Sequence, residues 1–408
     1  MNEAAHQKPG DGVAVLALAL LLGIQPVTTD LYLPALPELG APMAGAQLTL
    51  SALMLAFGLG QLLLGPLADR YGRRPVLLGG LSLYLLAALA AAAAGGIAQL
   101  VAWRALQGLG LAASVVCGRA MLRDWFEPQQ GAQVMARALT GLGILATLSP
   151  GIGGALTELF GWRSTLLATA AFAAAALGFI ALRVPESLAA RDPLALRPAH
   201  LLQSWALVLR HPTFRAYGLM TALGYGTLYT FLAGSSFVFI GILQVSRQSY
   251  GLMVGACAAV YVLGTLACRR LLPRHGIAAT AKRGAAFTLA GGLSVAGLAL
   301  AGVESVWALL LPQWLLIFGH GILQPCGQTG AVGPFPQRAG VASAWAGFLI
   351  ALTAFLVGAW LSHALARQAS VLTLALTLCA MALATVLVSW TWVQRPAPAL
   401  QAPAGRPT

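Results

Sequence analysis

One carboxylate stands well inside an apolar stretch of this 408-residue chain. Asp30 follows a hydrophobic run and precedes Pro34 and Pro37, whereas the rest of the 11 acidic residues fall in loops or near the ends of apolar stretches. A carboxylate within a membrane span costs about 2.5 to 3.5 kcal/mol on insertion scales, so it indicates a function by default. Such a group exchanges a proton as its surroundings change. The alternative is an Asp30 near the mouth of the span that caps a kink between Pro26 and Pro34.

An arginine lies inside the fourth apolar stretch, in the sequence W-R-A-L-Q-G at 103–108. Arg104, Gln107 and Gly108 are spaced i, i+3 and i+4, so a guanidinium, an amide and a point of close approach share one helical face. We expect this face to contact the first span. The alternative is a structural Arg104 that binds backbone carbonyls.

A charged turn, G-P-L-A-D-R-Y-G-R-R at 65–74, joins the second and third apolar stretches. We expect Gly65 to let two helices approach closely and Asp69 to cap a helix N-terminus or pair with an arginine. Gly72 permits a tight turn before Arg73 and Arg74.

A second copy of part of this turn follows the eighth stretch, as G-T-L-A-C-R at 264–269. The two halves of the chain therefore look related. Cys268 takes the place of Asp69, so we expect any charge-based contact to be weaker there. The five cysteines show no C-x-x-C spacing and are interpreted as small hydrophobic residues, neither disulfides nor metal ligands.

Two further regions carry candidate contacts. The fifth stretch is rich in glycine around Ser149 and Pro150, which predicts tight helix packing and a bend. Aromatic and polar side chains of the second half are candidates for binding, although most helical aromatics only pack or anchor. His320 is the only histidine well inside a span, and it either titrates or forms a hydrogen-bonded part of the core.

The elements that position these residues follow from composition. Hydrophobic residues make up 59% of the chain and the mean hydropathy is +0.80, so the bilayer is the solvent for most of it. Each stretch must be a helix, because lipid cannot satisfy backbone polar groups. We predict twelve spans, at about 12–37, 48–67, 76–96, 98–118, 134–157, 164–183, 214–242, 249–272, 281–302, 305–328, 339–363 and 370–393.

The basic residues that give the chain its net charge of +13 are distributed unevenly between the two sides of the membrane. With a cytoplasmic N-terminus, the outer loops receive only Arg163, Arg247 and Arg367 of the 24 basic residues. This distribution predicts that both termini are cytoplasmic, and it disfavours a nucleic-acid or phosphate site.

A polar, proline-rich segment divides the chain. We predict a first six-helix bundle at 1–185, a cytoplasmic linker at 186–212 and a second bundle at 213–408. Apolar residues at 194–209 predict a short helix, either on the membrane surface or packed under the bundles.

Four of these patterns resemble one family. The 65–74 turn and the R-x-x-Q-G pattern at 104–108 resemble motifs of the major facilitator superfamily. T-D-L-Y-L-P-A-L-P at 29–37 closely resembles its Bcr/CflA-type drug:proton antiporters, and the fifth stretch resembles their antiporter motif, with Ser-Pro where many members have Gly-Pro. The resemblance implies an all-α fold of twelve transmembrane helices in two bundles, with the substrate site between them.

The resemblance also implies roles for residues. Asp30 and Arg104 would couple protons. Arg123 and Asp124 would join the 65–74 turn in a conformational latch, or else remain solvated interfacial charges. The full candidate sets are the latch (Gly65, Asp69, Arg70, Gly72, Arg73, Arg74, Arg123, Asp124), antiporter-motif packing (Gly143, Ser149, Pro150, Gly153, Gly154) and the substrate cavity (Tyr32, Gln107, Tyr225, Tyr229, Trp314, His320, Gln324).

The predicted function is a proton-driven antiporter that exports drugs or toxic metabolites across the bacterial inner membrane. We expect a monomer in the lipid bilayer, with protons and a small molecule as partners and no cofactor, metal or nucleic acid. A proton-coupled nutrient importer is the alternative with the same fold. A membrane enzyme is a weaker alternative, because no paired membrane carboxylates, metal cluster or nucleophile motif stands in the sequence.

Overall fold

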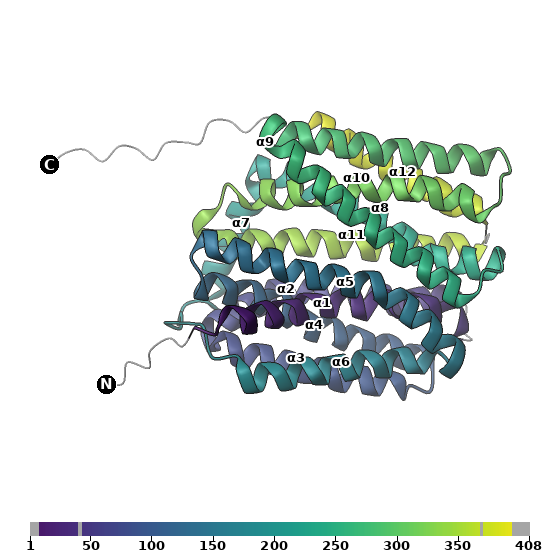
Figure 1. Ribbon diagram of the computed structural model, residues 1–408. Helices are drawn as coiled ribbons and strands as arrows, with labels where there is room; N and C mark the ends of the chain where they lie inside the picture. Colours follow the sequence, from purple (N-terminus) through teal and green to yellow (C-terminus); the bar gives the residue numbers. More distant parts are fainter. Residues whose placement is uncertain (1–7, 40–42, 368–369, 394–408) are drawn as a thin grey trace, which may run out of the picture.

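The computed structural model describes residues 8–39, 43–367 and 370–393, and its regular structure within them is entirely helical (Figure 1). The elements in chain order are α1 (Asp11–Asp30), the 3₁₀ helix η1 (Leu33–Glu38), α2 (Met43–Tyr71), α3 (Arg73–Ala92), α4 (Ile97–Trp125), α5 (Pro128–Phe160), α6 (Trp162–Arg183), α7 (Pro198–Arg210), α8 (Pro212–Ser236), the π-helix η2 (Phe237–Ile242), α9 (Arg247–Leu300), α10 (Val306–Val332), the 3₁₀ helix η3 (Pro336–Arg338), α11 (Ala339–Arg367) and α12 (Val371–Thr391).

Within the described residues, 11 helices are long and apolar enough to cross a membrane. One of them, α9, has 54 residues, whereas a single span needs about 20. Its backbone leaves helical geometry at Gly276 (φ 72°, ψ 174°), shortly after Pro273. Because glycine adopts positive φ and proline interrupts helices, α9 forms two consecutive crossings joined by a kink. The predicted fold of twelve membrane helices is therefore confirmed.

The helices form two groups (Figure 1). In the first half, α2 and α3 pack on α4, α3 on α6, and α1 on α5; in the second half, α9 packs on α10 and α12, and α8 on α10, α11 and α12. The predicted bundle boundaries lie on either side of the segment that contains α7, and they stay a prediction.

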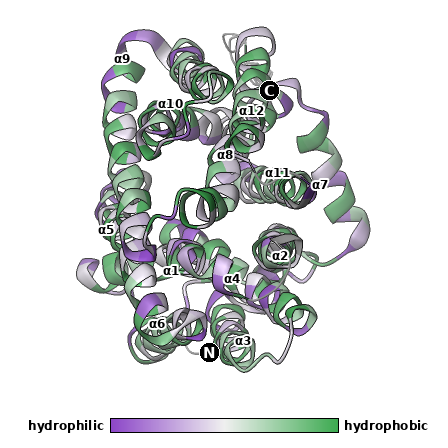
Figure 2. Cartoon of the chain, turned by 90° about the vertical axis from the view of Figure 1, so that its right-hand side faces the viewer, coloured by the Kyte–Doolittle hydropathy of each residue, from purple (hydrophilic) through white to green (hydrophobic). Residues whose placement is uncertain are grey.

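Two pairs of helices join the halves. Figure 2 shows α2 beside α11 and α5 beside α9, and both pairs are in contact. Glycines let the backbones touch in the α5–α9 pair: a Cβ added at Gly154 would lie 2.5 Å from the Arg247 carbonyl oxygen, and one at Gly255 would lie 2.5 Å from the Thr147 carbonyl oxygen. Since a side chain has no room there, this seam depends on glycine.

The two ends of the molecule differ. The end at which α7 lies in Figure 1 contains the α2–α3 turn and the start of α5, and it is called the arginine-rich end below. The opposite end contains η1, η2 and the α3–α4 connection.

The predicted short helix after the first bundle is α7, which spans Pro198–Arg210. Ser204 and Val208 are buried, and the ring of Trp205 lies 5.5 Å from that of Trp345 in an edge-to-face arrangement. Leu202 on α7 is 60% exposed. Of the two alternatives, the contacts favour a helix that packs under the second half, with an apolar residue left on its outer side.

Candidate functional site

Asp30 is the last residue of α1 and lies just before η1. Its carboxylate accepts a hydrogen bond from the Thr29 hydroxyl at 2.7 Å; within the described residues it has no ion pair and no backbone N–H donor, so it does not cap the kink. The side chain is partly buried, and η1, which follows it, contacts α8 and α9 of the second half. Asp30 therefore faces the second half.

Arg104 lies on the other side of α1. Its side chain is fully buried and donates to the Gln107 side-chain oxygen at 2.7 Å and to the Thr28 carbonyl at 3.2 Å. The guanidinium carbon also lies 4.5 Å from the centre of the Tyr32 ring. Residues four apart share a helix face, whereas residues two apart point in opposite directions. Arg104 therefore contacts the Thr28 side of the first span, and it forms no ion pair with Asp30.

A polar network extends from Arg104 into the first half. The Thr28 hydroxyl lies 2.6 Å from the Tyr84 hydroxyl, and the Gln107 amide donates to Thr169 at 3.5 Å. A buried arginine stays charged, so carbonyl, amide and aromatic partners must replace its hydration. Thr28, Tyr84 and Thr169 were missed in the sequence, although polar residues at the middle of apolar stretches are the signal that could have found them.

An aromatic cluster lies within the second half. Tyr225 stacks against Tyr229 with ring centres 6.4 Å apart, and His320 of α10 lies 6.1 Å from Tyr225. Tyr261 of α9 lies 5.8 Å from His320 and was not predicted. The structure thus brings three of the candidate cavity residues together, while Tyr32 and Gln107 belong to the Arg104 network.

The face of α10 that carries His320 is rich in polar groups. Gln313 and Gln324 lie two turns before and one turn after His320, which places them on the same face. Gln313 is 1% exposed, and neither of its side-chain polar atoms has a hydrogen-bond partner within the described residues, nor has Oε1 of Gln324. Buried polar atoms usually have partners, so this face has free hydrogen-bonding capacity. Trp314, one residue after Gln313, lies on a different side of α10.

The α2–α3 turn forms an ion-pair network. Arg73 pairs with Asp69 at 2.5 Å and with Asp124 of α4 at 3.3 Å. Gly72 has φ 112°, which glycine adopts readily. The side chain of Asp69 is 44% exposed and that of Asp124 is 23% exposed. The ion pair of Arg73 with Asp124 is therefore better shielded from solvent than its ion pair with Asp69.

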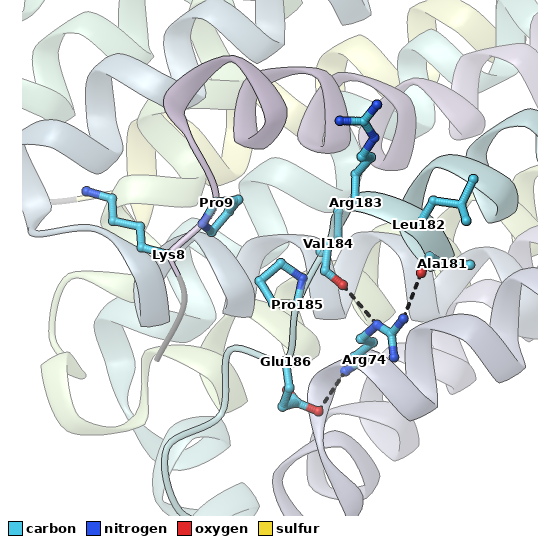
Figure 3. A pocket seen from close by; sticks show the side chains of 9 residues that line it. All are labelled: Lys8, Pro9, Arg74, Ala181, Leu182, Arg183, Val184, Pro185 and Glu186. Carbon is cyan, nitrogen blue, oxygen red and sulfur yellow. Dashed lines mark hydrogen bonds between the residues drawn. The ribbon is translucent and has the colours of Figure 1, made fainter. Parts of the chain in front are cut away.

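The linker supplies the cap of α3. The carboxylate of Glu186 accepts hydrogen bonds from the backbone N–H of Arg73 at 3.0 Å and of Arg74 at 3.2 Å. The Arg74 guanidinium donates to the carbonyls of Val184 at 2.9 Å and Ala181 at 2.8 Å (Figure 3). These groups line a polar cavity of about 360 Å³. Asp69 therefore pairs with an arginine while Glu186 caps the helix, a division of roles that the sequence did not reveal.

One expectation for the turn is wrong, and another stays untested. A Cβ added at Gly65 would lie 3.9 Å from Val116, an ordinary contact, so the predicted close helix approach at Gly65 is wrong. Arg70 donates to the carbonyl of Pro193 at 2.5 Å, and the backbone N–H of Asp192 donates to the Asp69 carbonyl at 3.0 Å. In this conformation the turn is tied to the linker, and the predicted latch between the halves stays a prediction.

A chamber of about 870 Å³ lies between the halves at the arginine-rich end. Asp69, Arg119 and Arg123 line it from the first half, and Arg338 and Ser343 from the second. The only side-chain hydrogen bond across it between described residues joins the Arg119 guanidinium to the Ser343 hydroxyl at 3.4 Å. The Gln47 amide closes the opposite end by donating to the Ala233 carbonyl. This conformation is open at the arginine-rich end.

The glycines of α5 meet two different partners. A Cβ at Gly153 would collide with the carbonyl of Leu31, next to Asp30, whereas Gly154 abuts the start of α9. The Ser149 hydroxyl donates to the Leu145 carbonyl at 2.6 Å, and the Pro150 carbonyl lies against Gly251. Gly143 is looser, since a Cβ there would lie 3.9 Å from Val262. The fifth span therefore presses on the segment that carries Asp30.

Comparison with known proteins agrees with this geometry. Residues 18–357 match the model of the Major Facilitator Superfamily. Multidrug resistance protein D of Escherichia coli is 30% identical over 341 residues, which cover 82% of this chain and 84% of the relative. The Chloramphenicol resistance protein of Pseudomonas aeruginosa is 30% identical over 324 residues, covering 77% and 75%.

Solved structures show the same fold. The human organic anion transporter MFSD10 (TETRAN) superposes with a TM-score of 0.71 at 21% identity, covering 93% of this chain and 100% of that one. A D-xylose-proton symporter gives a TM-score of 0.71 at 15% identity, covering 94% and 97%. These proteins are transporters rather than enzymes. The twelve-crossing fold, the ion-paired α2–α3 turn and the matched family model together show that this chain belongs to the major facilitator superfamily, among its Bcr/CflA-type multidrug-resistance members.

Proposed function

We propose that this protein is a proton-driven antiporter that exports drugs or toxic metabolites across the bacterial inner membrane, with both termini in the cytoplasm. The observation that carries the proposal is Asp30, a span carboxylate without an ion-pair partner among the described residues, which faces the second half across the junction of α1 and η1. The names of the multidrug and chloramphenicol resistance relatives support drugs as the cargo.

Asp30 is suited to compete for a proton and a substrate. The adjoining η1 contacts α8 and α9 of the second half, so movement of that half changes the solvation of the carboxylate. A protonated Asp30 is neutral and tolerates a closed, dry site, whereas an ionised one requires water, a donor or a cationic substrate. Proton binding from the outer side would therefore favour the return to the conformation that is open to the cytoplasm.

Arg104 has a positioning role in this proposal. It contacts Thr28, two residues before Asp30 in α1, through a carbonyl hydrogen bond, and Tyr32, two residues after Asp30, through the ring. The guanidinium thus fixes the end of the helix that presents the acid.

The second half supplies the substrate-binding wall. Tyr225, Tyr229 and His320 offer aromatic surface, and Gln313 and Gln324 offer unpartnered hydrogen-bonding atoms. Such a wall combines apolar contact with a few polar groups, as ligand pockets generally do.

Orientation is tested with reporter fusions. If the arginine-rich end is cytoplasmic, a cytoplasm-active reporter fused at Gln394, outside the described residues, should be active, and one in the 301–305 connection should not. A periplasm-only reporter that is active at Gln394 would overturn the orientation.

The proton-coupling role is tested in proteoliposomes that contain a pH dye and chloramphenicol. We expect Asp30→Asn to insert at normal levels but to lose substrate-induced proton release, because it has no titratable proton. Asp30→Glu should retain part of the activity with a shifted pH profile. Glu158→Gln, at an exposed acid near the end of α5, serves as the matched control and should behave like the wild type.

One outcome would contradict the role directly. An Asp30→Asn protein that still exports the drug, still loses export when the proton gradient collapses and keeps the wild-type pH dependence would require another proton carrier.

A further inference from the structure

Two cysteines that are far apart in the sequence touch inside the second half. Sγ of Cys268 in α9 lies 3.7 Å from Sγ of Cys326 in α10, and both residues are free thiols. Their exposed fractions are 1% and 0%. The other cysteines, Cys117, Cys257 and Cys379, are also free. The sequence predicts five small hydrophobic residues that form no disulfides, and the contact between Cys268 and Cys326 adds a possible chemistry to two of them.

The contact follows from the crossing of the two helices. Gly264 and Gly321 lie against each other one turn earlier, where a Cβ at either glycine would lie 3.0 Å from the Cα of the other. The first crossing of α9 and the helix α10 both run from the opposite end toward the arginine-rich end. Cys268 and Cys326 stand four and five residues further along, so the glycine contact holds their sulfurs side by side.

We propose that Cys268 and Cys326 are a site of two-electron oxidation, at which peroxide converts the pair into a disulfide that links α9 to α10. Hydrogen peroxide oxidises one thiol to a sulfenic acid and releases water. The second sulfur then attacks the first, the S–S bond forms, and a second water leaves with the hydroxyl oxygen and the thiol proton. Two thiols and one peroxide thus give one disulfide and two waters, and a dithiol reductant reverses the change.

The neighbouring thiol makes this outcome specific. A sulfenic acid without a nearby thiol proceeds to further oxidation, whereas one 3.7 Å from a thiol is trapped as a disulfide. Both sulfurs lie in an apolar cluster with Tyr217, Ile322 and Leu323. Buried neutral thiols react slowly, so the pair stays reduced in a reducing cytoplasm and responds only to sustained oxidant.

The link would join two functional surfaces. The first crossing of α9 forms the seam with α5 through Gly251 and Gly255, and α10 carries His320 and Gln324, two of the candidate substrate contacts. A disulfide between them makes the seam helix and the wall helix one covalent unit.

The test uses a full-length variant in which Cys117, Cys257 and Cys379 are replaced by alanine. A protease site is placed in the 301–305 connection, between α9 and α10. After peroxide treatment of membranes and cleavage, we expect the two fragments to migrate together on a non-reducing gel and to separate after reduction. Labelling of the denatured protein with maleimide-polyethylene glycol should fall from two tags to none and return after reduction.

Matched single variants Cys268→Ala and Cys326→Ala provide the control. Each should insert normally, because alanine suits the apolar cluster, and neither should give linked fragments. The proposal would be overturned by fragments that separate without reduction, or by oxidised protein that still accepts one maleimide tag. A linked species of twice the chain mass would overturn it as well.

Discussion

The two copies of the G-x-L-A-x-R sequence adopt the same position in each half but are stabilised by different contacts. Near the α2–α3 turn, Gly65 is loosely packed and the aspartate position forms one ion pair, with Arg73. In α9, Gly264 is pressed against the carbonyl of Phe318, and the equivalent position is a buried thiol that contacts another thiol. The first copy is held by charge and the second by backbone packing.

This difference indicates where each half tolerates movement. Ion pairs at a partly exposed turn contribute little to stability and exchange partners readily, since surface pairs are typically worth under about 1 kcal/mol. Glycine contacts in a buried crossing have no alternative arrangement, because interiors are close-packed. The α2–α3 turn can therefore change conformation, whereas α9 and α10 are expected to keep the same relative position at their crossing.

The largest effect should come from placing the charge of the first copy into the second. Cys268 is 1% exposed, and no described cation pairs with it, so Cys268→Asp buries an acid without a partner. We expect a loss of about 3 to 5 kcal/mol in stability, by analogy with broken buried ion pairs. Thermal melting in detergent measures it, with Cys268→Ser as the smaller polar control. A melting temperature equal to that of the wild type would remove the basis for the comparison.

From the sequence alone, Cys268→Asp is expected to have a smaller effect than the loss of the acid at Asp69. A position that already lacks the acid should accept one more easily than Asp69 accepts its loss, and only the burial of Cys268 shows why it should not.

A smaller effect is expected from alanine at the two equivalent glycines. Gly264→Ala places a Cβ against the Phe318 carbonyl and 3.0 Å from the Cα of Gly321, so we expect about 1 to 3 kcal/mol of destabilisation from overpacking. Gly65→Ala has room and should gain up to about 1 kcal/mol from helix propensity. Melting temperatures of the two variants side by side check this prediction, and equal shifts would mean that the two glycines are equivalent after all.

The smallest effect on stability is expected at Asp69. Its side chain is 44% exposed, so Asp69→Asn should change stability by less than about 1 kcal/mol. Under the proposed function it should nevertheless slow drug export several-fold, because the turn loses a partner for Arg73 that the latch requires. Export rates and melting temperatures measured on the same preparation separate the two effects. Unchanged export would argue against a latch at this turn.

Much of the fold could be predicted because lipid imposes a simple rule. Apolar stretches of about twenty residues must become helices, so the crossings follow from hydropathy alone. Asp30 and Arg104 could be identified for the same reason, since a charge inside such a stretch needs an explanation. The spacing of Arg104 and Gln107 also fixed their common face.

The rest of the candidate site could not be predicted, because it depends on which helices contact one another. Tyr84 and Tyr261 could not be distinguished from packing aromatics until their partners Thr28 and His320 were placed. Glu186 caps α3 from more than a hundred residues away, a contact that no local pattern encodes. Gly65 was misjudged because a glycine in a span predicts close packing only where another backbone crosses it.

The kink at Gly276 divides α9 into two arms that contact different parts of the molecule. No loop separates the two crossings of α9, because the helix is interrupted only at that residue. One arm lies on α5 of the first half, and the other arm packs at Gly292 against Ala382 of α12. Because Gly276 is the residue that leaves helical geometry between the two arms, a change in the angle between the α5–α9 seam and the arm on α12 would be concentrated at that residue.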